Sequence, residues 1–83
     1  MPLTPFQRGA CAALTIGAPA VGRLYRAICE TPGLSMPQLR AETGVVHANH
    51  RVLQLERAGL VVTRLERVRG RMCRLCFPTP EAG

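Results

Sequence analysis

The spacing of apolar residues changes at Gly59, and this change constrains the fold of the chain more than any other feature. Upstream of Gly59, apolar residues recur at intervals of three and four, which is the period of amphipathic helices. Downstream, Val61, Thr63 and Leu65 occupy alternate positions, as in a strand with one buried face. The sequence therefore predicts helices followed by a β-hairpin, an α+β fold that is mainly helical.

Two helices are predicted in the first part of the chain. Residues 4–7 combine an N-cap threonine, a proline at the first helical position and the glutamine of a capping box, so a short helix is expected over about residues 5–15. A second helix begins at Pro19 and ends at the Thr-Pro-Gly sequence of residues 31–33. The apolar stripe expected to lie in the core consists of Val21, Leu24, Tyr25 and Ile28.

Two further helices are separated by Gly44. Residues 35–38 form another capping box and begin a helix of about seven residues, which Gly44 is expected to close in the left-handed conformation. The next helix is expected from about Val46 to Ala58. Its predicted core arc consists of Val45, Ala48, Val52, Leu53 and Leu55. Its opposite, polar face carries His47, His50, Arg51, Gln54 and Arg57. Two short helices arranged in this way are typical of a helix-turn-helix.

The remainder of the chain is expected to form the hairpin. Arg69 and Gly70 make its turn, and Pro78 and Pro80 end the pairing. The two alternating sets on the return strand are Cys73, Leu75 and Phe77, and Met72, Arg74 and Cys76. We expect the inner face of the hairpin to cover the helices, with Cys73 in the core and Cys76 on the outer face.

A chain of 83 residues forms one domain with a small core. We expect an N-terminal helical extension at 1–17, the helix-turn-helix domain at 18–78 and a short tail at 79–83. The sequence has no apolar stretch long enough to span a membrane and no secretory signal, so a cytoplasmic protein with reduced cysteines is expected.

Charge favours an anionic partner. Eleven basic residues, all of them Arg, against five acidic ones give a net charge of +6, which biases a small protein toward nucleic acid. Catalysis is not indicated, because the chain has no Asp, no Gly-rich phosphate loop and no Ser-His-acid set. We expect no cofactor and no bound metal.

The order of elements resembles the winged helix-turn-helix transcription regulators of the broad MarR and ArsR type. The resemblance covers residues 19–78 and rests on the segment 35–60, in which Leu55-Glu56-Arg57-Ala58-Gly59-Leu60 leads into an Arg-rich hairpin. In those families this segment ends the recognition helix and begins the wing. The resemblance implies a three-helix core, a C-terminal wing and binding to double-stranded DNA. The chain lacks the long terminal helices of MarR-type proteins, so no ligand-pocket residues are carried over.

Residue types on the predicted recognition helix suit the major groove. Arginine can bind both acceptors of guanine, as Arg51 and Arg57 could, and Asn49 and Gln54 could bind adenine. The hairpin arginines are expected on phosphates or in the minor groove. The full set of expected DNA contacts is Gln38, His47, Asn49, His50, Arg51, Gln54, Arg57, Arg64, Arg67, Arg69, Arg71 and Arg74.

Alternatives remain open at this point. His47 and His50 are close enough in sequence to chelate a metal. Cys73 and Cys76, with Cys29 or Cys11, could form a metal or thiol switch, although strand residues three apart point to opposite faces. The hairpin could also be a solvated charged edge, and the domain could bind an acidic protein partner.

The leading interpretation is a homodimeric DNA-binding regulator that represses by occlusion, because one such domain covers only a few base pairs and no room remains for an activation domain. The first helix, with Phe6, Ala10, Ala13 and Leu14, is expected either to form the dimer contact or to cap the core of the monomer.

Overall fold

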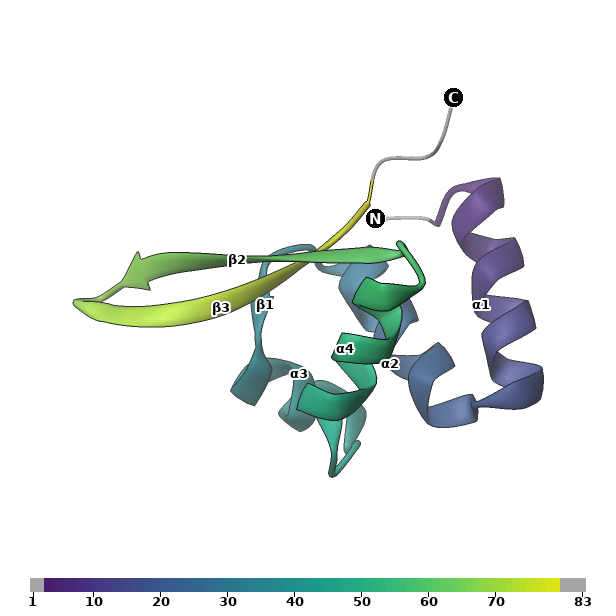
Figure 1. Ribbon diagram of the computed structural model, residues 1–83, viewed down its shortest axis with the longest axis horizontal. Helices are drawn as coiled ribbons and strands as arrows, with labels where there is room; N and C mark the ends of the chain where they lie inside the picture. The colour runs from purple at the N-terminus through teal and green to yellow at the C-terminus, as the bar shows by residue number, and fades with distance from the viewer. Residues whose placement is uncertain (1–2, 80–83) are drawn as a thin grey trace.

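The computed structural model describes residues 3–79 and shows a mostly helical α+β domain with a three-stranded antiparallel sheet. The helices gather at one end of the molecule, and a long two-stranded hairpin projects from the other (Figure 1). The elements in chain order are α1 (Pro5–Gly17), α2 (Pro19–Glu30), β1 (Leu34–Ser35), α3 (Met36–Thr43), α4 (Ala48–Arg57), β2 (Val61–Val68) and β3 (Arg71–Pro78).

Both predicted capping boxes are present. The Thr4 hydroxyl accepts a hydrogen bond from the Gln7 amide at 3.1 Å, and the Gln7 side chain accepts one from the Thr4 amide at 3.1 Å. Ser35 and Gln38 make the same reciprocal pair at the start of α3. These bonds satisfy amides that a helix leaves unpaired at its first turn. The sequence therefore places the starts of α1 and α3 correctly.

The turn between α3 and α4 also has the predicted conformation at Gly44, whose φ is +70°. The start of α4 is two residues later than expected, at Ala48 rather than Val46. The reason is the backbone of His47, which has φ −102° and ψ 50° and is therefore the N-cap residue instead of part of the helix.

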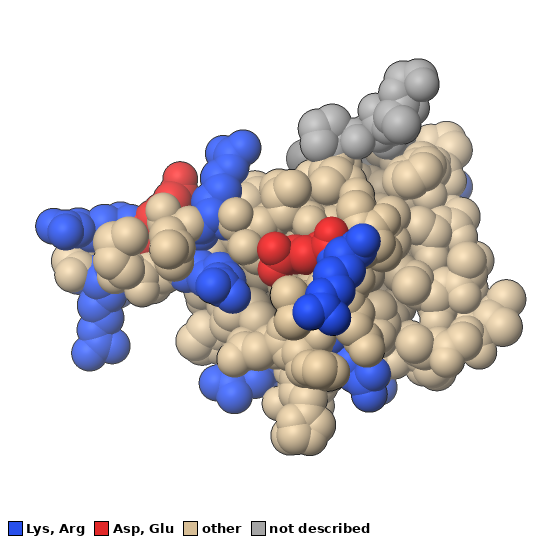
Figure 2. All heavy atoms as spheres, viewed as in Figure 1, with Lys and Arg blue, Asp and Glu red and all other residues tan. Residues whose placement is uncertain are grey.

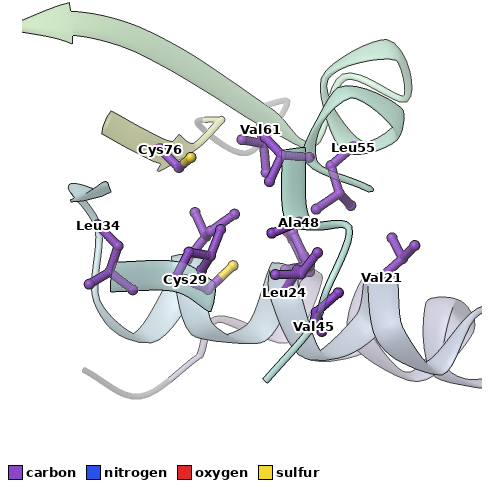
Figure 3. Close-up of a cluster of buried hydrophobic side chains, with 13 residues drawn as sticks. Val21, Leu24, Cys29, Leu34, Val45, Ala48, Leu55, Val61 and Cys76 are labelled. Carbon is purple, nitrogen blue, oxygen red and sulfur yellow. The ribbon is translucent and has the colours of Figure 1, made fainter. Parts of the chain in front are cut away.

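Helix α2 lies at the centre of the core. All four residues of its predicted stripe are buried, and they meet side chains from α3, α4 and the base of the hairpin (Figure 3). The buried apolar residues are Val21, Leu24, Tyr25, Ile28, Cys29, Leu34, Leu39, Val45, Ala48, Val52, Leu55, Val61 and Cys76. Burial of this cluster is the main source of stability in a domain this small.

The prediction that Leu53 faces the core is wrong. Its side chain is 40% exposed. The buried arc of α4 consists of Ala48, Val52 and Leu55. Each step along a helix rotates by about 100°, so Leu53 lies about 100° away from Val52, well outside that arc. Leu53 is therefore part of the outward surface of α4.

The hairpin turn is a tight one of two residues. Val68 pairs with Arg71, and the residues between them, Arg69 and Gly70, have φ values of 52° and 78°. Positive φ at both central positions is the signature of a type I′ turn, whose twist matches that of paired strands. The turn therefore sets a strict register along the whole hairpin.

That register reverses the predicted positions of two cysteines. Thr63 lies opposite Cys76, and directly opposed residues of antiparallel strands share a face. Cys76 is therefore on the same face as the buried Val61 and is itself completely buried, whereas Cys73 is half-buried on the other face. Two further contacts cover Cys76: β1 pairs with it through Leu34, and its thiol donates to the Met36 sulfur at 3.7 Å.

The hairpin covers the helices only at its base, which corrects the expectation that its whole inner face would do so. Along the inner face of β2, Val61 is buried, Thr63 is half-buried and Leu65 is 64% exposed. An eight-residue strand is about 26 Å long, and this length carries it past the short helices. The outer half of the hairpin projects into solvent (Figure 1).

Helix α1 packs along α2 but contributes no fully buried side chain. Ala10 and Leu14 pack against the core, whereas Phe6 and Ala13 face outward. The face of α1 that covers the core is therefore different from the face that is free to form a dimer contact.

At the other end of the described chain, Thr79 is tied to the loop before β2. Its amide and its hydroxyl donate to the carbonyls of Leu60 and Gly59, at 3.0 and 2.8 Å respectively. These bonds hold the end of β3 beside the start of β2. The rest of the predicted tail, 80–83, lies outside the described residues.

Candidate functional site

The polar face predicted for α4 points away from the core. His47, His50, Gln54 and Arg57 are exposed, as is Asn49 on an adjacent strip. The buried residues Ala48, Val52 and Leu55 hold the opposite side of the helix against the domain. The result is a helix of ten residues that is anchored by one side and presents hydrogen-bonding groups on the other.

Arg51 lies at one edge of this face and is half-buried. One of its guanidinium nitrogens is 3.5 Å from the side-chain oxygen of Gln54, one turn further along the helix. A bond of this length is weak, so most of the donor capacity of Arg51 is still free. Gln54 keeps its own amide donors as well. These two side chains are therefore available to a ligand as a unit.

The other edge of α4 faces the hairpin. The Thr63 hydroxyl of β2 donates to the carboxylate of Glu56 at 3.4 Å. Asn49 lines a groove of about 460 Å³ together with the first residues of α3 and residues 71–74 of β3. Part of the outward surface of α4 and the start of β3 therefore form a single concave surface.

The hairpin places its arginines on two faces. Arg67 and Arg74 share the face of Val61 and Cys76, which is the side of the sheet that the helices occupy. Arg64 is on the opposite face, where its guanidinium lies 5.0 Å from the centre of the Phe77 ring. Arg69 stands at the turn.

Positive charge is concentrated on the hairpin. Figure 2 shows basic side chains clustered over it, while the visible surface of α1 is almost uncharged. Residues 64–74 contain five Arg and one Glu, and within residues 3–79 none of these arginines forms an ion pair. Such a density of unpaired like charge is repulsive unless an anion lies beside it.

Gln38, which was also expected to bind DNA, forms part of the N-terminal cap of α3. Its side-chain oxygen accepts hydrogen bonds from both the amide and the hydroxyl of Ser35, at 3.0 and 3.1 Å. The residue is exposed at the start of α3, close to the groove. Its carbonyl is therefore committed to the helix cap.

Three of the cysteines, Cys11, Cys29 and Cys76, have the chemistry of packing residues. Burial raises the pKa of Cys29 to about 11, and burial also raises the pKa of the Cys76 and Cys11 thiols. A thiol that stays protonated is a poor nucleophile and a poor metal ligand. Over the described range 3–79, no group of three or more His, Cys, Asp or Glu is placed to hold a metal ion.

The sequence alone missed two features of this surface. Strand β1 has only two residues, too few to show alternation, and its partner is distant in sequence. Leu53 was assigned to the core although the helical wheel places it between Asn49 and Arg57, outside the apolar arc. That position was the signal that could have indicated its exposure.

Comparison with known proteins found no matching family model, no matching curated protein and no matching solved structure. Across residues 3–79, none of the helices has the length and apolar character needed to cross a membrane. What this surface binds must therefore be inferred from its own residues.

Proposed function

We propose that the chain is a winged helix-turn-helix regulator that binds double-stranded DNA in the cytoplasm. Two observations carry the proposal. The exposed His50, Gln54 and Arg57 lie on the outward face of α4, and the unpaired Arg67 and Arg74 lie on the hairpin face that the helices occupy. Between the two elements, Asn49 of α4 and residues 71–74 of β3 line one groove. The order of elements, with the hairpin after the second helix of a helix-turn-helix, is compatible with this fold.

The dimensions suit a duplex. An α-helix with its side chains is about 10–12 Å across and fits the major groove, which is about 12 Å wide. The ten residues of α4 extend about 15 Å along it. Arg51, Gln54 and Arg57 carry the side chains that recognise guanine and adenine edges in that groove. The hairpin, about 26 Å long, extends far enough beyond α4 to contact the flanking phosphates or minor groove.

The proposed active form is a homodimer that acts as a repressor. One domain contacts only a few base pairs, and two copies related by a two-fold axis would double the contacts and read a palindromic site. The outward face of α1 is an apolar stripe of Phe6, Gly9, Ala13 and Ile16, with Ile16 88% exposed. A second copy of α1 is a partner of matching character for such a stripe. Occupation of an operator by the dimer would block transcription.

Selection of duplexes from a random library by the full chain tests the proposal. We expect enrichment of one sequence, bound at least about a thousandfold more tightly than random duplex. Arg51→Ala or Gln54→Ala should relax the base preference, whereas Arg69→Ala should weaken binding to all duplexes by the same factor. Arg23→Ala, an exposed change on α2, is the matched control and should change neither. Retention of all duplexes with equal, weak affinity would contradict the proposal and favour an acidic protein partner instead.

A further inference from the structure

Leu53 is a large apolar side chain on a surface that is otherwise built for hydrogen bonding. It is 40% exposed, and its neighbours one turn away on α4 are Asn49 and Arg57, both exposed. A single exposed leucine is ordinary on a protein surface. The position of Leu53 is less ordinary, because it is part of the outward face that the proposed function places in the major groove.

The surroundings of Leu53 fix what it would contact. Asn49, four residues before it, lines the groove shared with β3, and Glu56, three residues after it, binds Thr63 of β2. Leu53 therefore lies on the side of α4 that turns toward the hairpin. A duplex held by both elements passes over this strip of the helix.

Leucine has no donor or acceptor, so its chemistry limits the base edge that it can meet. Packing it against a guanine, adenine or cytosine edge buries polar atoms without partners, which is unfavourable. Thymine alone among the four bases presents an apolar group in the major groove, the C5-methyl. On the basis of the proposed function, we propose that Leu53 is a specificity-determining residue that packs on the C5-methyl of a thymine in each half of the binding site.

Deoxyuridine provides the test, since it differs from thymidine only by that methyl group and keeps every base-pairing atom. In the duplex obtained by selection, each thymine is replaced in turn by deoxyuridine, and the affinity of the full chain is measured. We expect one position per half-site at which the change weakens binding by about fourfold, the value for burial of one methyl group. All other positions should be insensitive.

The second part of the test combines the change of base with a change of the protein, Leu53→Ala. This variant should bind the thymine duplex several-fold more weakly, and it should bind the thymine and deoxyuridine duplexes equally. Leu53→Met keeps an apolar side chain of similar reach and should restore part of the sensitivity. The matched control is Val62→Ala, a change at an apolar residue that is also 40% exposed but lies on the opposite face of β2, and it should keep full sensitivity to deoxyuridine. Circular dichroism should show the same fold for all three variants.

Two results would overturn the proposal. One is a wild-type chain that is indifferent to deoxyuridine at every position of a duplex that it otherwise selects. The other is a deoxyuridine penalty that persists at full size in Leu53→Ala. Either result leaves the proposed DNA-binding function intact. A chain that selects no duplex at all would overturn that function, and the role of Leu53 with it.

Discussion

Helix α1 and the β2–β3 hairpin are the two elements that extend beyond the buried core, and they differ in what they expose. Helix α1 has no fully buried residue and carries one charged side chain, Arg8. Residues 64–74 of the hairpin also contribute no buried side chain to the core, but they carry five arginines. Two regions that contribute no fully buried side chain therefore have opposite surface chemistry.

The difference shows that the two exposed surfaces have a chemistry that suits two different kinds of partner. An apolar stripe is unfavourable in water and is stabilised against another apolar surface, whereas a row of unpaired arginines is stabilised by a polyanion. The fold itself is carried by the cluster around α2. Each of the two elements can therefore be altered without destroying the domain, and this makes the comparison testable.

The largest expected effect is a difference in the free energy of unfolding between a change in the core and a change on α1. Leu24 is completely buried on α2, so Leu24→Ala should lower the free energy of unfolding by about 2–5 kcal/mol. Ile16→Ala on α1, matched in the atoms removed, should change the stability of the monomer by less than about 0.5 kcal/mol. Urea denaturation at low protein concentration measures both. Equal decreases would mean that α1 belongs to the core.

The next effect concerns the hairpin. Replacement of Arg67, Arg69 and Arg71 by Ala should weaken binding to every duplex. It should also make the plot of log affinity against log salt concentration shallower, by about 0.9 for each phosphate that the protein no longer neutralises. Arg8→Ala on α1 is the control and should leave the slope unchanged. Fluorescence anisotropy over a range of salt concentrations measures the slope, and a slope unaffected by the triple change would exclude the hairpin from the interface.

The third effect concerns the apolar stripe of helix α1, where an added charge is expected to disrupt the proposed dimer. Ile16→Glu should convert the proposed dimer to a monomer, because it would bury a carboxylate in an apolar contact. Val68→Glu, a similar change on the hairpin, should leave the dimer intact. Analytical ultracentrifugation distinguishes the two outcomes. A wild-type chain that is monomeric at every concentration, or a dimer that survives Ile16→Glu, would show that α1 serves only to cover α2.

A smaller effect is expected at alkaline pH from Cys29, which lies in the cluster around α2. Its folded pKa of about 11 exceeds the ordinary value of 9.0 because the thiol is buried. The unfolded chain therefore loses this proton first, so stability should be complete below about pH 9 and fall by about 1.4 kcal/mol per unit between the two values. Thermal unfolding across this range should show a shallower decline for Cys29→Ala. An identical decline would assign the decrease in stability to other groups.

The smallest effect is expected at the hairpin turn. Arg69 adopts φ 52°, a left-handed conformation that asparagine tolerates better than arginine. Arg69→Asn, which creates the preferred Asn-Gly pair of a type I′ turn, should stabilise the domain by about 0.5–1 kcal/mol and yet weaken DNA binding. Thermal unfolding and anisotropy on the same variant measure both. A stabilised variant with unchanged affinity would mean that Arg69 contacts no phosphate.

Local signals in the sequence predicted most of the helical fold. Capping boxes at Thr4 and Ser35, the stripe on α2 and the turns at Gly44 and Arg69–Gly70 depend on neighbouring residues, and all are present. What could not be predicted depends on distant contacts. Strand β1 exists because Leu34 and Ser35 meet β3, and Cys76 is buried because β1 and Met36 cover it.

The candidate site could be predicted in composition but not in arrangement. The helical period predicted the polar face of α4, and that face is turned outward in the structure. The alternation of the hairpin indicated an inner face but not how far the helices would cover it, since that depends on the relative lengths of strand and helices. The division of the hairpin arginines between two faces follows from a register that the turn sets.

The central claim is that α4 and the hairpin form one surface for DNA while α1 does not. Mapping of backbone amide shifts by nuclear magnetic resonance, during titration with the selected duplex, tests it most directly. We predict that the largest shifts fall between Asn49 and Arg57 and between Arg64 and Arg74, with amides on the outward face of α1 unchanged. Shifts concentrated on α1, or shifts on the hairpin without any on α4, would contradict the account.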